Sequence, residues 1–144
     1  KKQRAYYSGK RHRHTIKTQV ILLTDGKIMR IDQAKGAVHD FRLFKESLGA
    51  KTHESIRLVM DSGYQGVKKI HFNSFTPKKK PRGGELSDQD KAYNRALSRF
   101  RIKIENVHAW LKKFKIISAV YRNRRRRLGL RFSLICGIYN FENC

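Results

Sequence analysis

A long helical pattern between Ala92 and Ser118 constrains this chain more than any other feature. Its apolar residues recur at alternating spacings of four and three, which places them on one face of a helix: Tyr93, Leu97, Phe100, Ile104, Val107, Leu111 and Phe114. Ser87, followed by Asp90, resembles a capping box, so we expect the helix to begin there. Because a long helix is stabilised by packing of its apolar face, we expect the core to form against it.

A second set of residues follows a neighbouring stripe of the same helix. Arg101, Glu105, His108 and Lys112 recur with the same helical spacing, so one carboxylate lies at the edge of the apolar face among basic side chains. Glu105 could pair with Arg101 or Lys112. It could equally bind a hard metal ion, if a second carboxylate meets it. The helix by itself leaves both interpretations open.

The charge of the chain restricts its partners. The 144 residues include 34 Lys and Arg against 11 Asp and Glu, which gives a formal net charge of +23. A positive field of that size implies a polyanionic partner. No apolar run is long enough to span a membrane, so we expect no membrane association. The two cysteines, Cys136 and Cys144, form no zinc pattern and fit a reduced, cytoplasmic setting.

The remaining patterns predict an α/β fold with a mixed sheet that contains a hairpin. Asp25-Gly26 is a strong hairpin signal, and Gly36 precedes an amphipathic helix that begins at His39-Asp40. Asp40 is favoured there by the helix dipole. The expected elements are strands at 15–23, 28–31, 56–60 and 74–76, helices at 39–48, 64–72, 87–118 and 128–139, and a flexible basic linker at 77–86.

Two segments concentrate positive charge and are candidates for binding a phosphate backbone. The first, residues 1–14, has no acidic residue, and we interpret it as a flexible basic arm or a loop that leads into the sheet. The second, residues 121–127, contains the densest run of arginines, whose guanidinium groups match phosphate oxygens. A merely solvated basic surface remains the alternative for both. The candidate contacts are Lys10, Arg11, Arg13, Arg122, Arg124 and Arg125.

Asp61 follows directly after the short apolar strand at 56–60 and precedes Ser62-Gly63. The carboxyl end of a buried strand is where α/β proteins often place functional residues, although an aspartate there can also serve only to form the turn. Cleavage of a phosphodiester is well served by two divalent ions, which require oxygen ligands. Asp61 and Glu105 alone are too few ligands for two ions, so a third carboxylate is needed.

Several motifs, taken in order, resemble the catalytic domain of a DDE transposase from the bacterial insertion-sequence family numbered five. The resemblance covers nearly the whole chain, and a series of motifs in the right order is more specific than any one of them. The matching segments are Tyr6 to Lys10, His14 to Gln19, Gly36 to Asp40, Asp61 to Gly66, Pro77 to Gly84, Asn94 to Lys112, Tyr121 to Arg124, and Tyr139-Asn140.

This resemblance implies a ribonuclease-H-like mixed sheet with flanking helices, and metal-dependent cleavage and strand transfer at the ends of an insertion sequence. The family's second and third acidic residues fall on Asp61 and Glu105, which would bind two Mg²⁺ or Mn²⁺ ions in the complete site. Arg101 and Lys112 would contact phosphates, while Ser98 stands where the family usually has Tyr. The implied partners are transposon-end and target DNA and further copies of the chain. The implied location is the bacterial cytoplasm, at the nucleoid.

The family's first catalytic aspartate lies on a strand ahead of Tyr6, and none of Asp25, Asp32 or Asp40 matches it. We therefore expect residues 1–144 to form a partial catalytic domain that lacks its central first strand, with residues 87–144 as its C-terminal helices. We expect this chain not to cleave DNA alone. The competing hypothesis is a non-catalytic basic module that binds DNA or RNA, such as an inhibitor of transposition.

Overall fold

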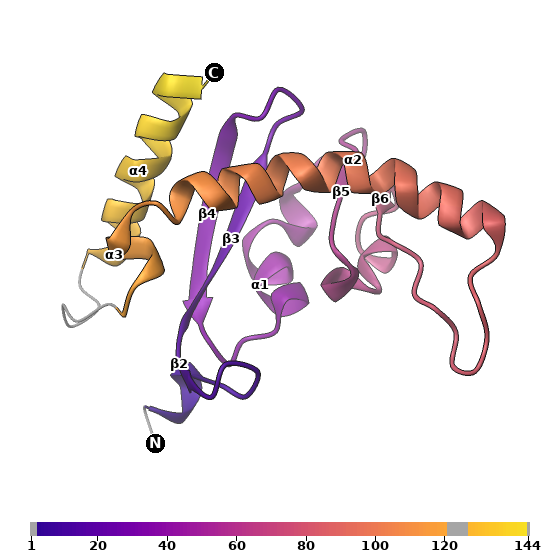
Figure 1. Cartoon of the computed structure of the whole chain (residues 1–144), viewed down its shortest axis with the longest axis horizontal. Helices are drawn as coiled ribbons and strands as arrows, with labels where there is room; N and C mark the ends of the chain where they lie inside the picture. The colour runs from indigo at the N-terminus through magenta and orange to yellow at the C-terminus, as the bar shows by residue number, and fades with distance from the viewer. Residues whose placement is uncertain (1–2, 121–126, 144) are drawn as a thin grey trace. The chain divides into compact units, whose positions relative to one another are not determined.

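The computed structural model describes residues 3–120 and 127–143 (Figure 1). The chain divides into two compact units. The first unit comprises Lys1–Lys17 and Ala34–Arg101, and the second comprises Thr18–Gln33 and Ile102–Cys144. The predicted arginines 122, 124 and 125 lie outside the described residues.

Two small sheets and one amphipathic helix organise the first unit. The strands of one sheet, β1 and β2, are antiparallel, with Tyr7 opposite His14, whereas β5 and β6 are parallel, with Leu58 opposite Ser74. Leu43 and Phe44 of the helix α1 are buried. The elements are η1 (Arg4–Tyr6), β1 (Tyr7–Ser8), β2 (Arg13–His14), α1 (Asp40–Ser47), η2 (Gly49–Lys51), β5 (Leu58–Val59), η3 (Ser62–Tyr64), η4 (Val67–Lys69), β6 (Ser74–Phe75) and the first part of α2 (Asp88–Leu111).

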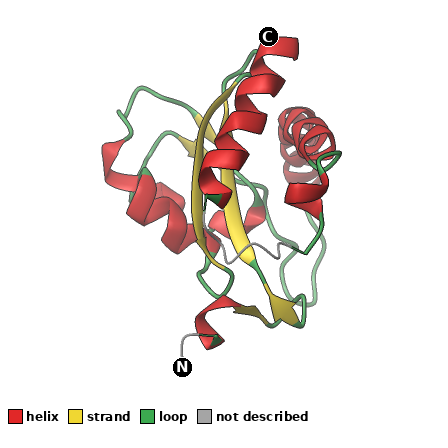
Figure 2. Ribbon diagram, turned by 90° about the vertical axis from the view of Figure 1, so that its left-hand side faces the viewer, coloured by secondary structure: helices red, strands yellow, loops and turns green. Residues whose placement is uncertain are grey.

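A hairpin and the C-terminal helices form the second unit. The strands β3 (Ile16–Leu22) and β4 (Ile28–Lys35) pair with each other, and each has one end in the first unit. The turn between them is the predicted one: Gly26 has a φ of 103°, and the Leu23 N–H donates to the Lys27 carbonyl at 2.9 Å. The helices are the end of α2, then α3 (Lys115–Ser118) and α4 (Leu128–Asn143), which lies along the hairpin in Figure 2.

The core of the second unit joins residues that are far apart in sequence. Val107 and Leu111 of α2, both 1% exposed, pack with Phe132 and Ile135 of α4 and with Ile28 of β4. The side chain of Asn140 holds α4 to the strand through two hydrogen bonds to Ile28. Its Oδ1 accepts from the Ile28 N–H at 2.8 Å, and its Nδ2 donates to the Ile28 carbonyl at 2.9 Å.

The predicted long helix begins where expected but ends early. The Asp90 N–H donates to Ser87 Oγ at 3.1 Å, which confirms the N-terminal cap. The expected end at Ser118 was wrong, because α2 stops at Leu111 and the separate helix α3 follows. Phe114 adopts an extended conformation at the break, and Phe114 and Ile117 pack against the core of the second unit, so tertiary packing overrides helix propensity here.

Three other expectations need correction. The helix expected over 64–72 was wrong: one 3₁₀ turn ends at Tyr64 and a second covers only Val67–Lys69, with the positive φ of Gly66 between them. The strand expected over 56–60 is only β5, two residues long. The N-terminal arm contains the β1–β2 hairpin, whose turn passes through His12 at a φ of 50°, a conformation that His adopts more readily than most residues.

Candidate active site

Asp61 lies where the strand β5 ends and the chain turns. The Met60 N–H donates to the carbonyl of Phe75 at 2.9 Å, which continues the parallel pairing with β6 up to the residue before Asp61. Asp61 then caps the 3₁₀ turn Ser62–Tyr64, and its Oδ1 accepts from the Ser62 N–H at 2.7 Å. This bond fixes the orientation of a carboxylate whose side chain is 59% exposed. The predicted position of Asp61 at the end of a strand is confirmed, but the expectation that this strand is buried was wrong, because Leu58 is half-buried and Val59 is 38% exposed.

Arg101 is the predicted phosphate ligand that the structure brings to Asp61. Its Nη1 lies 3.9 Å from Asp61 Oδ1, and both side chains remain about half exposed. An ion pair of this length at the surface contributes little to stability. The carboxylate is therefore oriented and partly neutralised while solvent, a metal ion or a phosphate can still reach it.

A second carboxylate, Asp40, borders the turn that follows Asp61. A Cβ added to Gly63 would lie 3.5 Å from Asp40 Oδ2, so the carboxylate lies against the backbone of this turn. Lys17 Nζ contacts Asp40 Oδ1 at 3.0 Å. Burial and the negative charges of Asp40 and Asp61 together raise the pKa of Tyr64 to about 12, so its phenol stays protonated at neutral pH.

The sequence pattern placed Asp40 only in the first turn of a helix, and nothing in it distinguished Lys17 from the other basic residues. The one available signal was the His39-Asp40 pair among the matching motifs. The pairing of Lys17 with Asp40 joins two residues far apart in sequence, and no local pattern contains it.

Glu105 belongs to the second unit and lies on the exposed side of α2. His108, one turn on, is half-buried, and burial together with the charge of Lys112 lowers its pKa. Lys112 follows the last residue of α2, and its N–H donates to the His108 carbonyl at 3.1 Å. Asp61 and Glu105 therefore lie in different units, and each is positioned by its own element.

Lys10, Arg11 and Arg13 lie together on the β1–β2 hairpin, and all three are exposed. The Arg11 N–H donates to the Ser8 carbonyl at 3.2 Å, and the ring of Tyr7 packs edge-on against that of His14, with centroids 6.1 Å apart. These predicted phosphate ligands are therefore carried by a defined turn and not by an irregular arm.

The carboxylates of Asp61 and of the nearby Asp40 suit a hard cation, since carboxylate oxygens are the ligands that Mg²⁺ and Mn²⁺ prefer. Among residues 3–120 and 127–143, no three His, Cys, Asp or Glu side chains come together as a ligand set. This part of the chain therefore offers suitable ligands but no complete metal site of its own. Across the same residues, no helix has the length and apolar character to span a membrane.

Comparison with known proteins identifies the family. The family model described as DDE superfamily endonuclease matches residues 1–140. The chain is 50% identical over 143 residues to a protein of Microchaete diplosiphon named as a probable transposase for insertion sequence element IS702. That match covers 99% of this chain and 51% of the relative, so the chain spans about half the relative's length. No solved structure matches. The chain belongs to the DDE superfamily endonuclease family.

Proposed function

We propose that this chain is the C-terminal part of a transposase catalytic domain, which cuts and joins DNA strands at the ends of an insertion sequence. The observation that carries the proposal is the 50% identity to a probable transposase over nearly the entire chain. The orientation of Asp61 at the end of a parallel strand supports it, because an exposed, oriented carboxylate is what a catalytic metal needs.

Asp61 and Glu105 are proposed as two of the three carboxylates of the site, on the strength of the family resemblance. Bound Mg²⁺ or Mn²⁺ would supply activation of the attacking water or 3′-hydroxyl and stabilisation of the departing oxygen. The Ser62 N–H holds the Asp61 carboxylate in place, and Lys17 neutralises Asp40 close by. Arg101 and Lys112 would bind the phosphates that flank the cut.

The proposed fold of the complete domain is ribonuclease-H-like. The chain supplies a β3–β4 hairpin, a helix and a parallel β5–β6 pair in the order that such a fold requires. The first catalytic aspartate would come from a further strand in the half of the transposase that this chain does not match. We expect the 144-residue chain alone to leave DNA uncut for that reason.

DNA binding by the chain itself follows from its charge of +23 and from the exposed cations of the β1–β2 hairpin. Each phosphate contact releases counterions, so log K should fall linearly with log salt by about 0.9 per contact. Replacing Lys10, Arg11 and Arg13 by Gln should lower that slope by about 2 to 3. We place this activity in the bacterial cytoplasm, at the nucleoid, in a complex with more than one copy of the chain.

The cleavage proposal is tested in the chain joined to the missing half of the transposase. A labelled transposon end is incubated with Mg²⁺ or Mn²⁺, and Asp61→Asn and Glu105→Gln are compared with the controls Asp88→Asn and Glu46→Gln, which remove surface carboxylates elsewhere on helices. We expect the first two variants to lose cleavage by at least about 100-fold while they still bind DNA, and the controls to cut normally. Cleavage by either of the first two variants at the normal rate would refute the assignment.

The second candidate function is a non-catalytic DNA-binding or RNA-binding module that inhibits transposition. The basic hairpin and the overall charge are sufficient for it, since neither requires a metal. A joined protein that binds transposon ends with the expected salt dependence but never cuts them would favour this function.

A further inference from the structure

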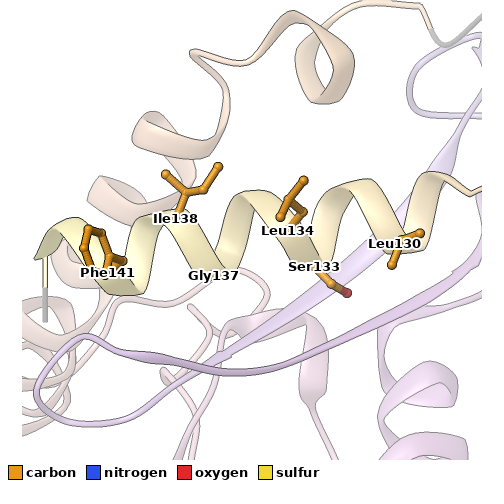
Figure 3. Close-up of a pocket in the computed structure, with 6 residues that line it drawn as sticks. All are labelled: Leu130, Ser133, Leu134, Gly137, Ile138 and Phe141. Atoms are coloured by element: carbon orange, nitrogen blue, oxygen red, sulfur yellow. The ribbon is translucent and has the colours of Figure 1, made fainter.

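The last helix, α4, is apolar on two opposite sides. One side contributes Phe132, Ile135 and Cys136 to the core of the second unit. The other side carries a shallow apolar groove, shown in Figure 3. Its lining residues are Leu130, Ser133, Leu134, Gly137, Ile138 and Phe141.

These outer side chains are strongly exposed. Leu130 is 69%, Leu134 65% and Phe141 90% accessible to solvent. An amphipathic surface helix would place polar residues here, and a helix that is apolar on every side is normally covered on every side. The outer side of α4 therefore has the character of an interface.

The small residues Ser133 and Gly137 lie beside Leu134 and Ile138 in the middle of this surface, and Leu130 and Phe141 lie at its ends. A Cβ added to Gly137 would meet no atom within 4 Å, and Ser133 lies one turn before it. Small residues one turn apart allow the backbone of a second helix to approach closely. The groove is thus shaped for a helix.

We propose that the occupant is α4 of a second copy of this chain, packed antiparallel across a two-fold axis near the middle of the helix. The two-fold axis passes between Ile135 and Cys136. A residue that lies a given number of positions before this point in one copy therefore faces the residue that lies equally far after it in the other copy. Leu134 then faces Gly137 of the second copy, Ser133 faces its Ile138, and Leu130 faces its Phe141. Large side chains meet small ones at the centre, and two large apolar side chains meet at each end.

The charges of α4 suit the same arrangement. In a chain of net charge +23, this helix has one basic residue, Arg131, near its start and one acidic residue, Glu142, near its end. The antiparallel register brings Arg131 towards Glu142 of the second copy at both ends of the pair. α4 is therefore a neutral surface on which two strongly basic chains can meet.

The size of the surface sets its strength. Residues 130–141 span about 17 Å of helix at 1.5 Å per residue, and one helix face covers less than the ~800 Å² per partner of a stable complex. We expect a dimer that forms and dissociates with concentration. The dimer proposal rests on the proposed function only in that the active complex holds more than one copy of the chain. Dimerisation is measured without DNA or metal, so a chain that does not dimerise would leave the cleavage proposal intact.

The first test is sedimentation of the 144-residue chain over a range of concentrations at about 0.1 M and about 0.5 M NaCl. The higher salt shortens the Debye length from about 10 Å to between 3 and 10 Å and screens the repulsion between basic chains. We expect the mass to double with concentration, and association to strengthen with salt, opposite to DNA binding. Leu134→Glu should weaken association at least tenfold. Ile102→Glu is the matched control, since Ile102 is a 56% exposed helical residue of the same unit, and it should associate like the unaltered chain.

The second test measures the register in a Cys144→Ser background, in which Cys136 is buried. Leu130→Cys and Phe141→Cys chains are mixed and treated with a short bismaleimide. These two positions lie about 16 Å apart along one helix, so in the antiparallel pair only position 130 of one copy and position 141 of the other lie within its reach. We expect the product that joins one chain of each kind to dominate over both products that join identical chains. A parallel pair would join identical chains and overturn the register. A chain that stays monomeric at all concentrations, or an α4 face that binds only the missing half of the transposase, would overturn the proposal.

Discussion

Asn140 offers the sharpest test of how the second unit is held together. Its side-chain amide bonds both the N–H and the carbonyl of Ile28, at 2.8 Å and 2.9 Å, across 112 positions of sequence. Each hydrogen bond contributes about 1 kcal/mol, and Ile28 is 7% exposed, so unpaired backbone groups there would also be desolvated. We expect Asn140→Ala to lower the free energy of unfolding by about 2 to 4 kcal/mol.

Asn140→Asp separates the two bonds. At neutral pH the introduced carboxylate can still accept from the Ile28 N–H, but it places a negative oxygen against the Ile28 carbonyl. Only its protonated form can donate to that carbonyl, so its pKa in the folded chain should rise above the ordinary value of about 3.9. Because of the raised pKa, the Asn140→Asp variant is more stable with this group protonated than with it ionised. That gain in the free energy of unfolding is complete below about pH 3.9 and is lost as the pH rises through the pKa of the group in the folded chain.

The assay is urea unfolding followed by circular dichroism at several pH values, with the unaltered chain measured beside each variant so that other titrating groups cancel. We expect Asn140→Asp to be less stable than the unaltered chain by at least about 2 kcal/mol at pH 7, and this difference to shrink towards pH 4. An Asn140→Ala variant within 0.5 kcal/mol of the unaltered chain, or a difference for Asn140→Asp that does not depend on pH, would refute this reasoning.

Three further predictions concern separate sites. A Cβ at Gly36 would lie 2.7 Å from the carbonyl oxygens of Thr15 and Tyr6 and would collide with Thr15 Oγ1, so Gly36→Ala should lower the melting temperature sharply, while Gly9→Ala, with no atom within 4 Å, should have little effect. Phe132→Ala should cost about 3 to 5 kcal/mol in urea unfolding because it opens the core, whereas Phe72→Ala, at an 87% exposed residue, should change stability by less than about 0.5 kcal/mol. The pKa of His108 is lowered in the folded chain, so as the pH falls below about 6.5 a proton binds to this imidazole in the unfolded chain first. The free energy of unfolding should therefore fall between about pH 7 and pH 5, and His108→Gln should make it depend less on pH.

Local sequence signals predicted the Asp25-Gly26 turn and the start of α2 correctly, because short-range chemistry determines them. The Asp25-Gly26 hairpin formed as expected, with the Lys27 N–H donating to Asp25 Oδ1 at 2.9 Å. The cap at Ser87 formed for the same reason. Each depends on residues within three or four positions, so their patterns were readable without tertiary information.

Tertiary contacts decided the features that the sequence did not reveal. The helix expected to reach Ser118 breaks after Leu111, because Phe114 and Ile117 pack against the core of the second unit. The approach of Arg101 to Asp61 and that of Lys17 to Asp40 likewise depend on how distant segments fold. Phe100, which the helical periodicity assigns to the apolar stripe, is 51% exposed.

The central proposal is that Asp61 and Glu105 bind the same divalent cation in the complete catalytic domain. Mn²⁺ line broadening in the NMR spectrum of the labelled chain, joined to the missing half of the transposase, tests it most directly. Mn²⁺ at low concentration should broaden the backbone amide signals of Ser62 and Asn106 together, and Asp61→Asn should weaken the broadening at Asn106 as well as at Ser62. Broadening at Asn106 that is unchanged by Asp61→Asn, or none at either residue, would contradict a shared metal site.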